Sequence, residues 1–168
     1  MKVLFVLLLI GLVSKIESRK FTKCELLPIF LDEGFPLEEF PDWLCVIQSE
    51  SSFNSSAIGG PNSNGSFDWG LFQSESAFNS SAIGGPNSNG SFDYGLFQIN
   101  ENYWCKVGQA GNDCNIDCND LLDDDLTDDL KCVKKIYARH GFSAWNGWKK
   151  WCQGTLPTYR ECMPCRAP

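Results

Sequence analysis

Apolar residues recur at helical spacing in the two outer parts of the chain and gather around turn signals in its middle. This pattern predicts four helices, which begin at or just after Thr22, Pro41, Thr127 and Ala144. Thr22 and Glu25 have the spacing of a capping box. Pro28 falls inside the first helix, where its missing N–H is expected to kink or shorten that helix. Gly141 is the expected stop of the third helix, and the fourth is expected to end at Cys152.

The middle of the chain contains a near-identical repeat, with residues 48–73 followed by the same pattern at 73–98. Each copy holds an Asn-Gly pair, at 64–65 and at 89–90, which favours the tight turn of a β-hairpin. Helices at both ends and hairpins between them predict the α+β class. Two copies are too few for a solenoid, so we interpret them as a tandem duplication inside one domain, with an error in the gene sequence as the alternative.

The N-terminus has the organisation of a secretory signal. Lys2 precedes an apolar run at 3–13 that is too short to span a bilayer, and residues 14–18 are mostly small or polar. We expect a signal peptide at 1–18 and a secreted, extracellular domain at 19–168. No other stretch is apolar enough to predict a membrane helix.

The chain carries 14 Lys and Arg residues against 21 Asp and Glu residues, a formal net charge of −7. An acidic protein lacks the attraction that non-specific binding to nucleic acid or to an anionic membrane requires, so we predict neither partner.

Nine cysteines follow the signal segment. In a secreted protein they predict a disulfide framework with one odd thiol, although spacing alone leaves 105 ways to pair any eight of them.

Two pairs of carboxylates share one spacing, Glu50 with Asp68 and Glu75 with Asp93. Glu50 is expected at the end of the second helix, and each Asp lies beyond a hairpin turn. Cleavage of a glycosidic bond requires one protonated and one ionised carboxyl group on facing elements. On spacing alone, four unrelated surface acids among the 21 Asp and Glu residues would be the better explanation.

Longer motifs favour a pair of catalytic carboxylates over unrelated surface acids. KFTKCEL at 20–26, GSFDYGLFQINENYWC at 90–105 and GFSAWNGWKKWC at 141–152 resemble the C-type lysozymes, the family that also contains α-lactalbumin. The resemblance implies a lysozyme-like α+β fold, with a helical subdomain, a small antiparallel β subdomain and four disulfides. By the same match, those pairs would be Cys24–Cys162, Cys45–Cys152, Cys105–Cys118 and Cys114–Cys132. Cys165 would then be the odd thiol, in an extra tail at 163–168.

The resemblance also implies an activity, that of a bacteriolytic muramidase. Such an enzyme cleaves β-1,4 glycosidic bonds of peptidoglycan or chito-oligosaccharides with retention of the anomeric configuration. We expect it to act as a monomer and without a catalytic cofactor. Glu50 resembles the general acid and Asp93 the second carboxylate, with Asp68 as the alternative from the duplicate copy. Continuity of the DYGLFQIN run favours Asp93. Sugar contacts are expected from Gln98, Asn100, Tyr103, Trp104, Ala144 and Trp145. Trp148 and Trp151 are expected to pack mostly in the core.

Six aspartates crowd the segment between Cys118 and Cys132, which suggests either a solvated loop or an oxygen-ligand site for a hard cation. The run LLDDDLTDDLKC at 121–132 resembles the calcium loop of α-lactalbumin and of calcium-binding lysozymes. That match implies side-chain ligands from Asp123, Asp128 and Asp129 and backbone carbonyl ligands from Asp120 and Asp125. A calcium-stabilised binding or regulatory protein without catalysis is therefore the alternative function, and the duplicated segment, which could cover the cleft, favours it.

Overall fold

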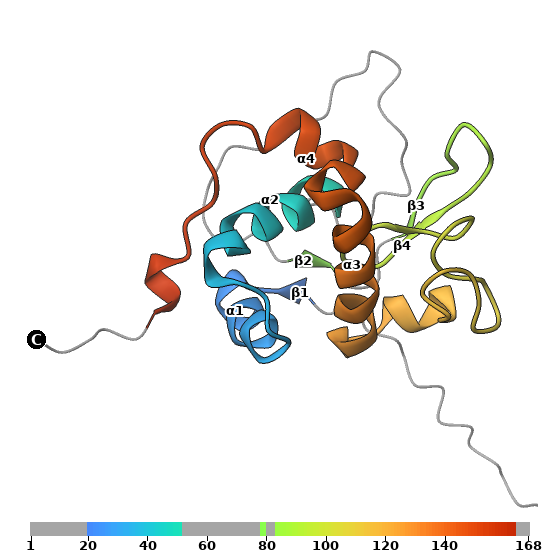
Figure 1. Cartoon of the computed structure of the whole chain (residues 1–168), viewed down its shortest axis with the longest axis horizontal. Coiled ribbons are helices and arrows are strands. Elements are labelled where there is room, and N and C mark those ends of the chain that lie inside the picture. Colours follow the sequence, from blue (N-terminus) through green and yellow to red (C-terminus); the bar gives the residue numbers. More distant parts are fainter. Residues whose placement is uncertain (1–19, 52–77, 80–82, 164–168) are drawn as a thin grey trace, which may run out of the picture.

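The computed structural model describes residues 20–51, 78–79 and 83–163, and Figure 1 shows its elements in chain order. The α-helices are α1 (Lys23–Asp32), α2 (Phe40–Glu50), α3 (Leu126–His140) and α4 (Asn146–Trp151). The strands are β1 (Lys20–Phe21), β2 (Phe78–Asn79), β3 (Ile83–Gly84), β4 (Asp93–Tyr94) and β5 (Ile99–Asn100). Short 3-10 helices cover Leu37–Glu39, Cys118–Leu122, Gly141–Ala144 and Arg160–Cys162. No helix within these ranges is long and apolar enough to cross a membrane.

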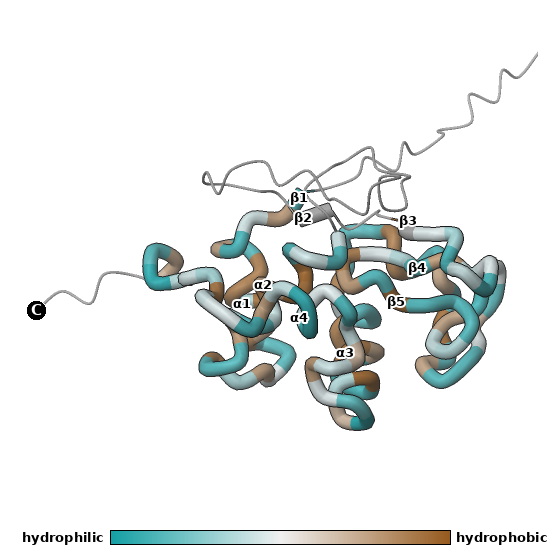
Figure 2. The backbone as a smooth tube through the Cα atoms, turned by 90° about the horizontal axis from the view of Figure 1, so that it is seen from above, coloured by the Kyte–Doolittle hydropathy of each residue, from teal (hydrophilic) through white to brown (hydrophobic). Residues whose placement is uncertain are grey.

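The strands form two small antiparallel sheets. β3, β4 and β5 make a three-stranded sheet in chain order, and β1 pairs with β2. Both views place the three-stranded sheet beside α3 and away from α1, so that α2, α3 and α4 lie between the sheet and α1 (Figures 1 and 2). The hairpin predicted around Asn89-Gly90 is present, with Gly90 at φ 81° in the connection from β3 to β4. Its counterpart at 64–65 lies outside the described residues. The predicted α+β class is confirmed.

Capping explains where the helices begin. Thr22 and Glu25 form the predicted capping box, in which the Glu25 N–H donates to Thr22 Oγ1 (3.2 Å) and the Thr22 N–H to Glu25 Oε2 (2.7 Å). α1 continues past Pro28 to Asp32, so the proline does not shorten it. The prediction that α3 begins at or just after Thr127 is wrong, because α3 begins at Leu126. Asp125 is the cap, because its carboxylate accepts the N–H of Thr127 at 3.0 Å.

The segment expected as one helix from Ala144 to Cys152 is divided. A 3-10 turn ends at Ala144, Trp145 adopts an extended backbone, and α4 covers only Asn146–Trp151. Trp148 stacks on Phe142 with ring centroids 5.4 Å apart, as expected for a core residue. Trp151, however, is 40% exposed, so its predicted place in the core is wrong.

Trp43 of α2 lies at the centre of an aromatic core. Its indole is fully buried, with ring centroids of Phe142 at 4.6 Å, Tyr137 at 5.1 Å and Trp145 at 5.3 Å. These partners come from α3 and from the two turns that follow it. Because each packs on Trp43, α2 has a fixed position in the molecule.

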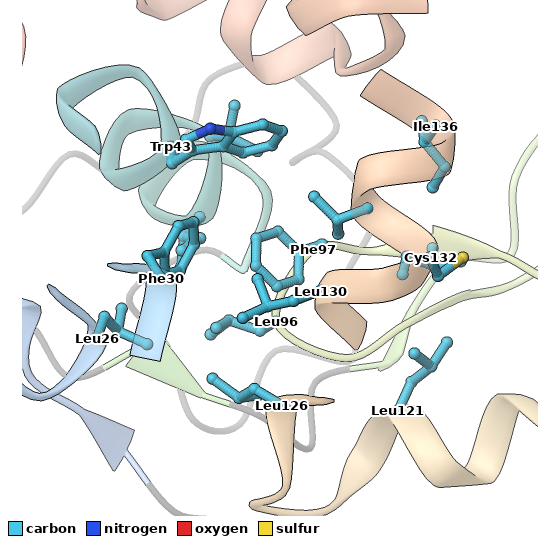
Figure 3. Packing of buried hydrophobic residues seen from close by; sticks show 14 of the residues in the cluster. Leu26, Phe30, Trp43, Leu96, Phe97, Leu121, Leu126, Leu130, Cys132 and Ile136 are labelled. Atoms are coloured by element: carbon cyan, nitrogen blue, oxygen red, sulfur yellow. The ribbon is translucent and has the colours of Figure 1, made fainter. Parts of the chain in front are cut away.

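The turn between β4 and β5 enters the same core. Phe97 lies 6.1 Å from the ring of Phe30 and 6.4 Å from that of Trp43. Figure 3 shows Phe97 and Leu96 between these aromatic rings and the side chains of α3. The core therefore joins the sheet to the helices in one packed unit.

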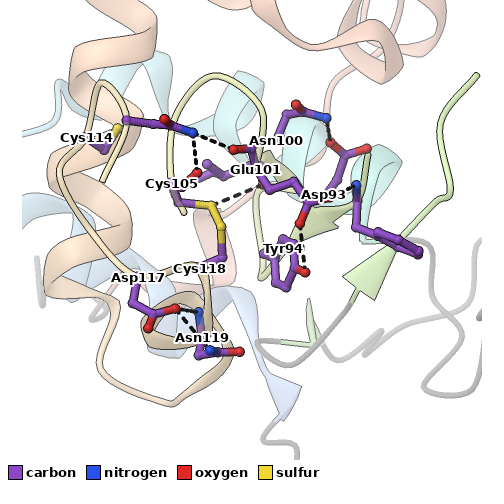
Figure 4. Close-up of a disulfide and its surroundings, with 12 residues drawn as sticks. Asp93, Tyr94, Asn100, Glu101, Cys105, Cys114, Asp117, Cys118 and Asn119 are labelled. Atoms are coloured by element: carbon purple, nitrogen blue, oxygen red, sulfur yellow. Dashed lines mark hydrogen bonds between the residues drawn. A yellow bond between two sulfur atoms is a disulfide. The ribbon is translucent and has the colours of Figure 1, made fainter. Parts of the chain in front are cut away.

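Four disulfides are present, and each is a pair that the resemblance implied. They join Cys24 to Cys162, Cys45 to Cys152, Cys105 to Cys118 and Cys114 to Cys132. The third bridge fastens the loop after β5 to the 3-10 helix before α3 (Figure 4). Cys165, the expected odd thiol, lies outside the described residues.

Gly95 is a sensitive position in the turn between β4 and β5. It is buried at φ 74°, and an alanine Cβ there would overlap the carbonyl oxygen of Leu121. We expect Gly95→Ala to lower the free energy of unfolding by about 3 kcal/mol, since a left-handed backbone at alanine costs about 1–2 kcal/mol and overpacking about 1–3 kcal/mol. Gly108→Ala is the matched control, because Gly108 has a similar φ of 81° with open space around it. Its expected cost is about 1 kcal/mol. Equal costs in denaturant unfolding would contradict this prediction.

Candidate active site

Glu50 is the last residue of α2, and its carboxyl group lies against the start of α4. Oε1 accepts the backbone N–H of Gly147 at 2.7 Å. Burial raises the pKa of Glu50 above its ordinary value and is the largest influence on it. The hydrogen bond from Gly147 and the charge of Lys149 lower this pKa, whereas the charge of Asp93 raises it. The net result is a carboxyl group that keeps its proton to a higher pH than an exposed glutamate.

Gly147 itself is a site residue that the sequence analysis did not single out. A Cβ at this position would overlap the Ser49 hydroxyl and lie 2.8 Å from Glu50 Oε1. The lack of a side chain therefore permits the approach of α4 to the end of α2. The sequence did contain a signal for this contact, namely a glycine in a predicted helix. Alanine is more favourable there by roughly 0.5–1 kcal/mol, so a glycine suggests that another segment packs closely at that position.

Asp93 lies in β4, and its carboxylate is held by side-chain amides. Asn100 of β5 donates to Oδ1 at 2.6 Å, and Asn87 donates to Oδ2 at 2.9 Å. Both amide nitrogens also donate to Ser91 Oγ, at 2.9 and 3.2 Å. Figure 4 shows the Asn100 amide directed at Asp93 across the two strands. This network fixes the orientation of the carboxylate.

The structure brings Glu50 and Asp93 close enough for the charge of Asp93 to affect the pKa of Glu50. Their surroundings differ, because Glu50 is partly buried and desolvation raises its pKa, whereas Asp93 is surrounded by amide donors. A proton donor beside an oriented carboxylate is the arrangement that acid-catalysed cleavage of an acetal requires. Asp68 and Glu75, the other two acids of the repeat, lie outside the described residues.

Three of the six predicted sugar-binding residues make hydrogen bonds within the protein through their side chains. The side-chain amide of Gln98 donates to the Gly95 carbonyl at 2.9 Å, and the Asn100 amide is bound to Asp93. Trp145 is only 5% exposed, and its indole N–H donates to the Phe97 carbonyl at 3.0 Å. Trp145 is thus part of the wall beneath the site rather than an open stacking surface.

The other three predicted residues line one pocket of about 670 Å³, and Tyr103 is 62% exposed there. The lining residues are Asn102, Tyr103, Trp104, Asn112, Asp113, Arg139, His140 and Ala144. Sequence reasoning missed five of these. Arg139 and His140 end α3, immediately before the stop at Gly141, and nothing in their local pattern indicates a pocket.

The pocket is closed on one side by contacts to Trp104. The Arg139 guanidinium lies 5.0 Å from the centroid of the Trp104 ring, and the His140 ring meets the same indole edge-on at 5.9 Å. Arg139 also forms an ion pair with Asp113. This pair joins the end of α3 to the loop after β5, so it connects the helical part to the sheet side of the pocket.

A second cluster of acids surrounds the start of α3. Asp129 is fully buried, and neither of its carboxylate oxygens has a hydrogen-bond partner in the described part of the chain. Burial raises its pKa well above the ordinary value, and the charges of Asp128, Asp123 and Asp125 raise it further. The pKa of Asp128 is also raised, mainly by burial.

The other predicted calcium ligands lie around this buried acid. Asp123 Oδ1 accepts the N–H of Asp125 at 2.8 Å, while the Asp125 side chain caps α3. Asp120 lies in the 3-10 helix Cys118–Leu122, and its charge raises the pKa of Asp128. Across residues 20–51, 78–79 and 83–163, no three His, Cys, Asp or Glu residues are arranged as a metal-binding group. The buried, unbonded carboxylate nevertheless fits a hard cation, because an ion would supply the partner that both oxygens lack.

The pKa of Glu50 should respond in opposite directions to its two charged neighbours. Lys149→Ala removes a positive charge and should raise this pKa, whereas Asp93→Asn removes a negative charge and should lower it. NMR titration of the Glu50 carboxyl carbon would measure both changes. Lys150→Ala is the control, as Lys150 lies over the Trp151 ring and is not among the charges that shift Glu50. Equal titration of wild type and both variants would contradict the described arrangement.

Comparison with known proteins identifies the family. The sequence profile of the C-type lysozyme/alpha-lactalbumin family matches residues 73–162, which include Asp93. The chain is 41% identical over 148 residues to lysozyme c-1 of Anopheles gambiae, covering 88% of this chain and 87% of that protein. It is 39% identical over 163 residues to a lysozyme of Bombyx mori, covering 96% of this chain and 100% of that protein.

Solved structures agree with the sequence relatives. Holo-type canine milk lysozyme is 34% identical with a TM-score of 0.61, and the match covers 82% of this chain and 92% of that chain. A calcium-binding lysozyme from equine milk is 32% identical with a TM-score of 0.59, with the same coverage. The predicted lysozyme-like fold is confirmed, and this chain belongs to the C-type lysozyme/alpha-lactalbumin family.

Proposed function

We propose that this protein is a secreted muramidase that hydrolyses the β-1,4 glycosidic bonds of peptidoglycan with retention. One observation carries the proposal: a partly buried Glu50 with a raised pKa lies within the electrostatic reach of Asp93, which is oriented by amides. Similarity to insect lysozymes supports the same activity.

In this mechanism, Glu50 is the general acid. Its raised pKa keeps the proton available, and Glu50 transfers it to the leaving glycosidic oxygen as the bond breaks. Asp93 meets the positive charge that develops at the anomeric carbon and forms the covalent intermediate of a retaining enzyme. Glu50, now ionised, takes a proton from water, which attacks that intermediate. Retention requires the two carboxyl groups to approach to about 5–5.5 Å in the substrate complex.

Substrate binding is assigned to the pocket that contains Tyr103, Trp104 and Ala144. The exposed Tyr103 ring and the Trp104 ring supply apolar faces for sugar rings, while Asn102 and Asn112 supply amide groups for the acetamido substituents. Gln98, Asn100 and Trp145 are assigned a supporting role, because their polar groups are already bonded to protein. This division modifies the expectation that all six predicted residues touch sugar.

Asp93, rather than Asp68, is proposed as the second carboxylate. β1 pairs with β2 at Phe78–Asn79, in the second repeat segment, and β4 follows in the same segment. Glu50 is the last residue of α2, near the start of the first repeat segment. The surplus 25 residues of the duplication would then fall between α2 and β2.

Secretion is proposed from the signal-like segment at 1–18, with 19–168 as a single domain and 163–168 as an extra tail. Four disulfides in the described chain agree with an oxidising compartment. A monomer is proposed.

Two isosteric variants test the catalytic assignment. Glu50→Gln and Asp93→Asn should each lower the rate of wall lysis by about 10²- to 10⁴-fold, the usual contribution of a general acid or nucleophile. Turbidity clearing of bacterial walls and hydrolysis of a chito-oligosaccharide would measure the loss. Glu38→Gln is the matched control, because Glu38 is exposed in the 3-10 helix Leu37–Glu39. Asp68→Asn should leave activity unchanged.

The outcomes separate the candidate functions. Loss of activity in Asp68→Asn with retention in Asp93→Asn would move the site to the first repeat segment. An inactive wild-type protein that still binds oligosaccharide would favour the non-catalytic alternative. An activity maximum at alkaline pH would contradict Glu50 as the acid, since its proton is lost as the pH rises through its pKa.

We also propose calcium as a structural ion at the start of α3. Asp123, Asp128 and Asp129 would provide side-chain oxygens, and Asp120 and Asp125 backbone carbonyls. The buried, unbonded oxygens of Asp129 are the main support. The ion would offset the repulsion that raises the pKa values of Asp128 and Asp129.

Calcium should therefore stabilise the native protein. At a calcium concentration 100 times the dissociation constant, we expect a gain of about 2.7 kcal/mol relative to chelator, measured by thermal unfolding at low salt. Asp129→Asn should abolish this gain. In chelator this variant should be at least as stable as wild type at neutral pH, because the raised pKa means that the buried charge destabilises the fold above that pKa.

Asp124→Asn is the control for calcium, since Asp124 lies in the same acidic run but is outside the proposed ligand set. It should retain the calcium effect. Identical melting temperatures of wild type with calcium and with chelator would exclude this site.

A further inference from the structure

Glu101, the residue directly after β5, binds both neighbours of Asp93. Its Oε1 accepts the backbone N–H of Phe92 at 2.9 Å, and its Oε2 accepts the phenol of Tyr94 at 3.1 Å. The backbone N–H of Glu101 donates in turn to the Phe92 carbonyl at 3.1 Å. Figure 4 shows Glu101 beside Tyr94 and Asp93. Three hydrogen bonds from one residue therefore fix β4 immediately before and after Asp93.

The adjacent residue completes this arrangement. Asn100 faces Asp93 across the sheet, and its amide donates to Asp93 Oδ1 at 2.6 Å. A shift of β4 relative to β5 would move that amide away from the carboxylate. Asn100 and Glu101 thus form a two-residue unit in which one side chain holds the Asp93 carboxylate and the other holds the backbone that carries it.

Further contacts hold this unit rigid. The Asn112 amide donates to the Glu101 carbonyl and to the Cys105 carbonyl, both at 2.6 Å. Tyr94 is buried, and burial together with the Glu101 hydrogen bond raises the pKa of its phenol. The phenol therefore remains a donor to Glu101 over the whole range of pH in which a glycosidase operates.

We propose that Glu101 is a positioning residue for the second carboxylate, which anchors Phe92 and Tyr94 so that the Asn100 amide stays aligned on Asp93. The inference rests on the proposed function for its catalytic consequence, but the alignment itself is a property of the fold. Glu101 makes no direct hydrogen bond to Asp93 in this arrangement. It acts through the backbone of β4 and through Asn100.

The test compares Glu101→Ala with Glu101→Gln. Loss of both anchors in Glu101→Ala should lower kcat about tenfold or more with little change in KM, since small displacements of a reacting group cost rate rather than binding. Glu101→Gln should keep kcat within about threefold of wild type. Its Oε1 can still accept from Phe92, and its amide can donate to the Tyr94 oxygen.

A matched control separates positioning from stability. Glu39 accepts the phenol of Tyr137 at 3.0 Å, which is a partly buried carboxylate–phenol bond remote from Asp93. Glu39→Ala should lower the melting temperature to a similar extent while kcat stays unchanged. If Glu101→Ala fails to fold, Tyr94→Phe removes one of the two side-chain anchors and should lower kcat about two- to threefold.

A direct readout keeps the proposal separate from the activity. Exchange of the Asn100 side-chain amide protons with solvent, followed by NMR, should be faster in Glu101→Ala than in wild type or Glu39→Ala. Faster exchange in a protein without glycosidase activity would support the positioning role and refute the proposed function. Unchanged exchange, a wild-type kcat in Glu101→Ala, or equal kcat losses in Glu101→Ala and Glu39→Ala would overturn the inference.

Discussion

The hydrogen bond from the Gly147 N–H to Glu50 is the interaction on which the site depends. It satisfies a carboxyl group that would otherwise be enclosed without a partner, and it joins the end of α2 to the start of α4. The aromatic core around Trp43 holds both helices in that relation. The same hydrogen bond lowers the pKa of Glu50, against the larger effect of burial, which raises it.

The protein uses burial of acids in two different ways. Glu50 is enclosed but bonded, so burial adjusts its affinity for a proton. Asp129 is buried, and neither of its carboxylate oxygens has a hydrogen-bond partner in the described residues. Its desolvation therefore costs free energy that no hydrogen bond offsets. Asp93 represents the opposite case, a carboxylate surrounded by donors and fixed in direction. The three acids differ mainly in what surrounds them, which is a property of packing rather than of residue type.

Local signals in the sequence were sufficient where the chemistry is local. The Thr22–Glu25 cap, the Gly141 stop and the hairpin near Gly90 depend on residues a few positions apart. Capping of α3 was misassigned because Asp125 and Thr127 are both good capping residues, and only the backbone decides between them. The disulfide pairs came from the family resemblance, since spacing alone did not choose among the possible pairings.

The candidate site was only partly predictable, because some of its contacts form between residues far apart in the sequence. Recognisable motifs contain Glu50, Asp93 and the pocket residues Tyr103 and Trp104. Arg139 meets Trp104 only through the tertiary fold, and no pattern along α3 distinguishes it from a solvated helix end. Trp145 is buried, which the sequence could not indicate, because a tryptophan before a short helix has the same sequence appearance whether its face is open or enclosed.

The Cys24–Cys162 bridge has a consequence for how the chain tolerates changes in length. It closes a loop with a sequence separation of 138 residues, and the connection from α2 to β2 lies inside that loop. Because the entropy of a cross-linked loop grows only with the logarithm of its length, removing or adding 25 residues there changes the closure free energy by about 0.2 kcal/mol. Evolution can therefore lengthen this connection almost without thermodynamic penalty, provided that the inserted segment does not obstruct the groove.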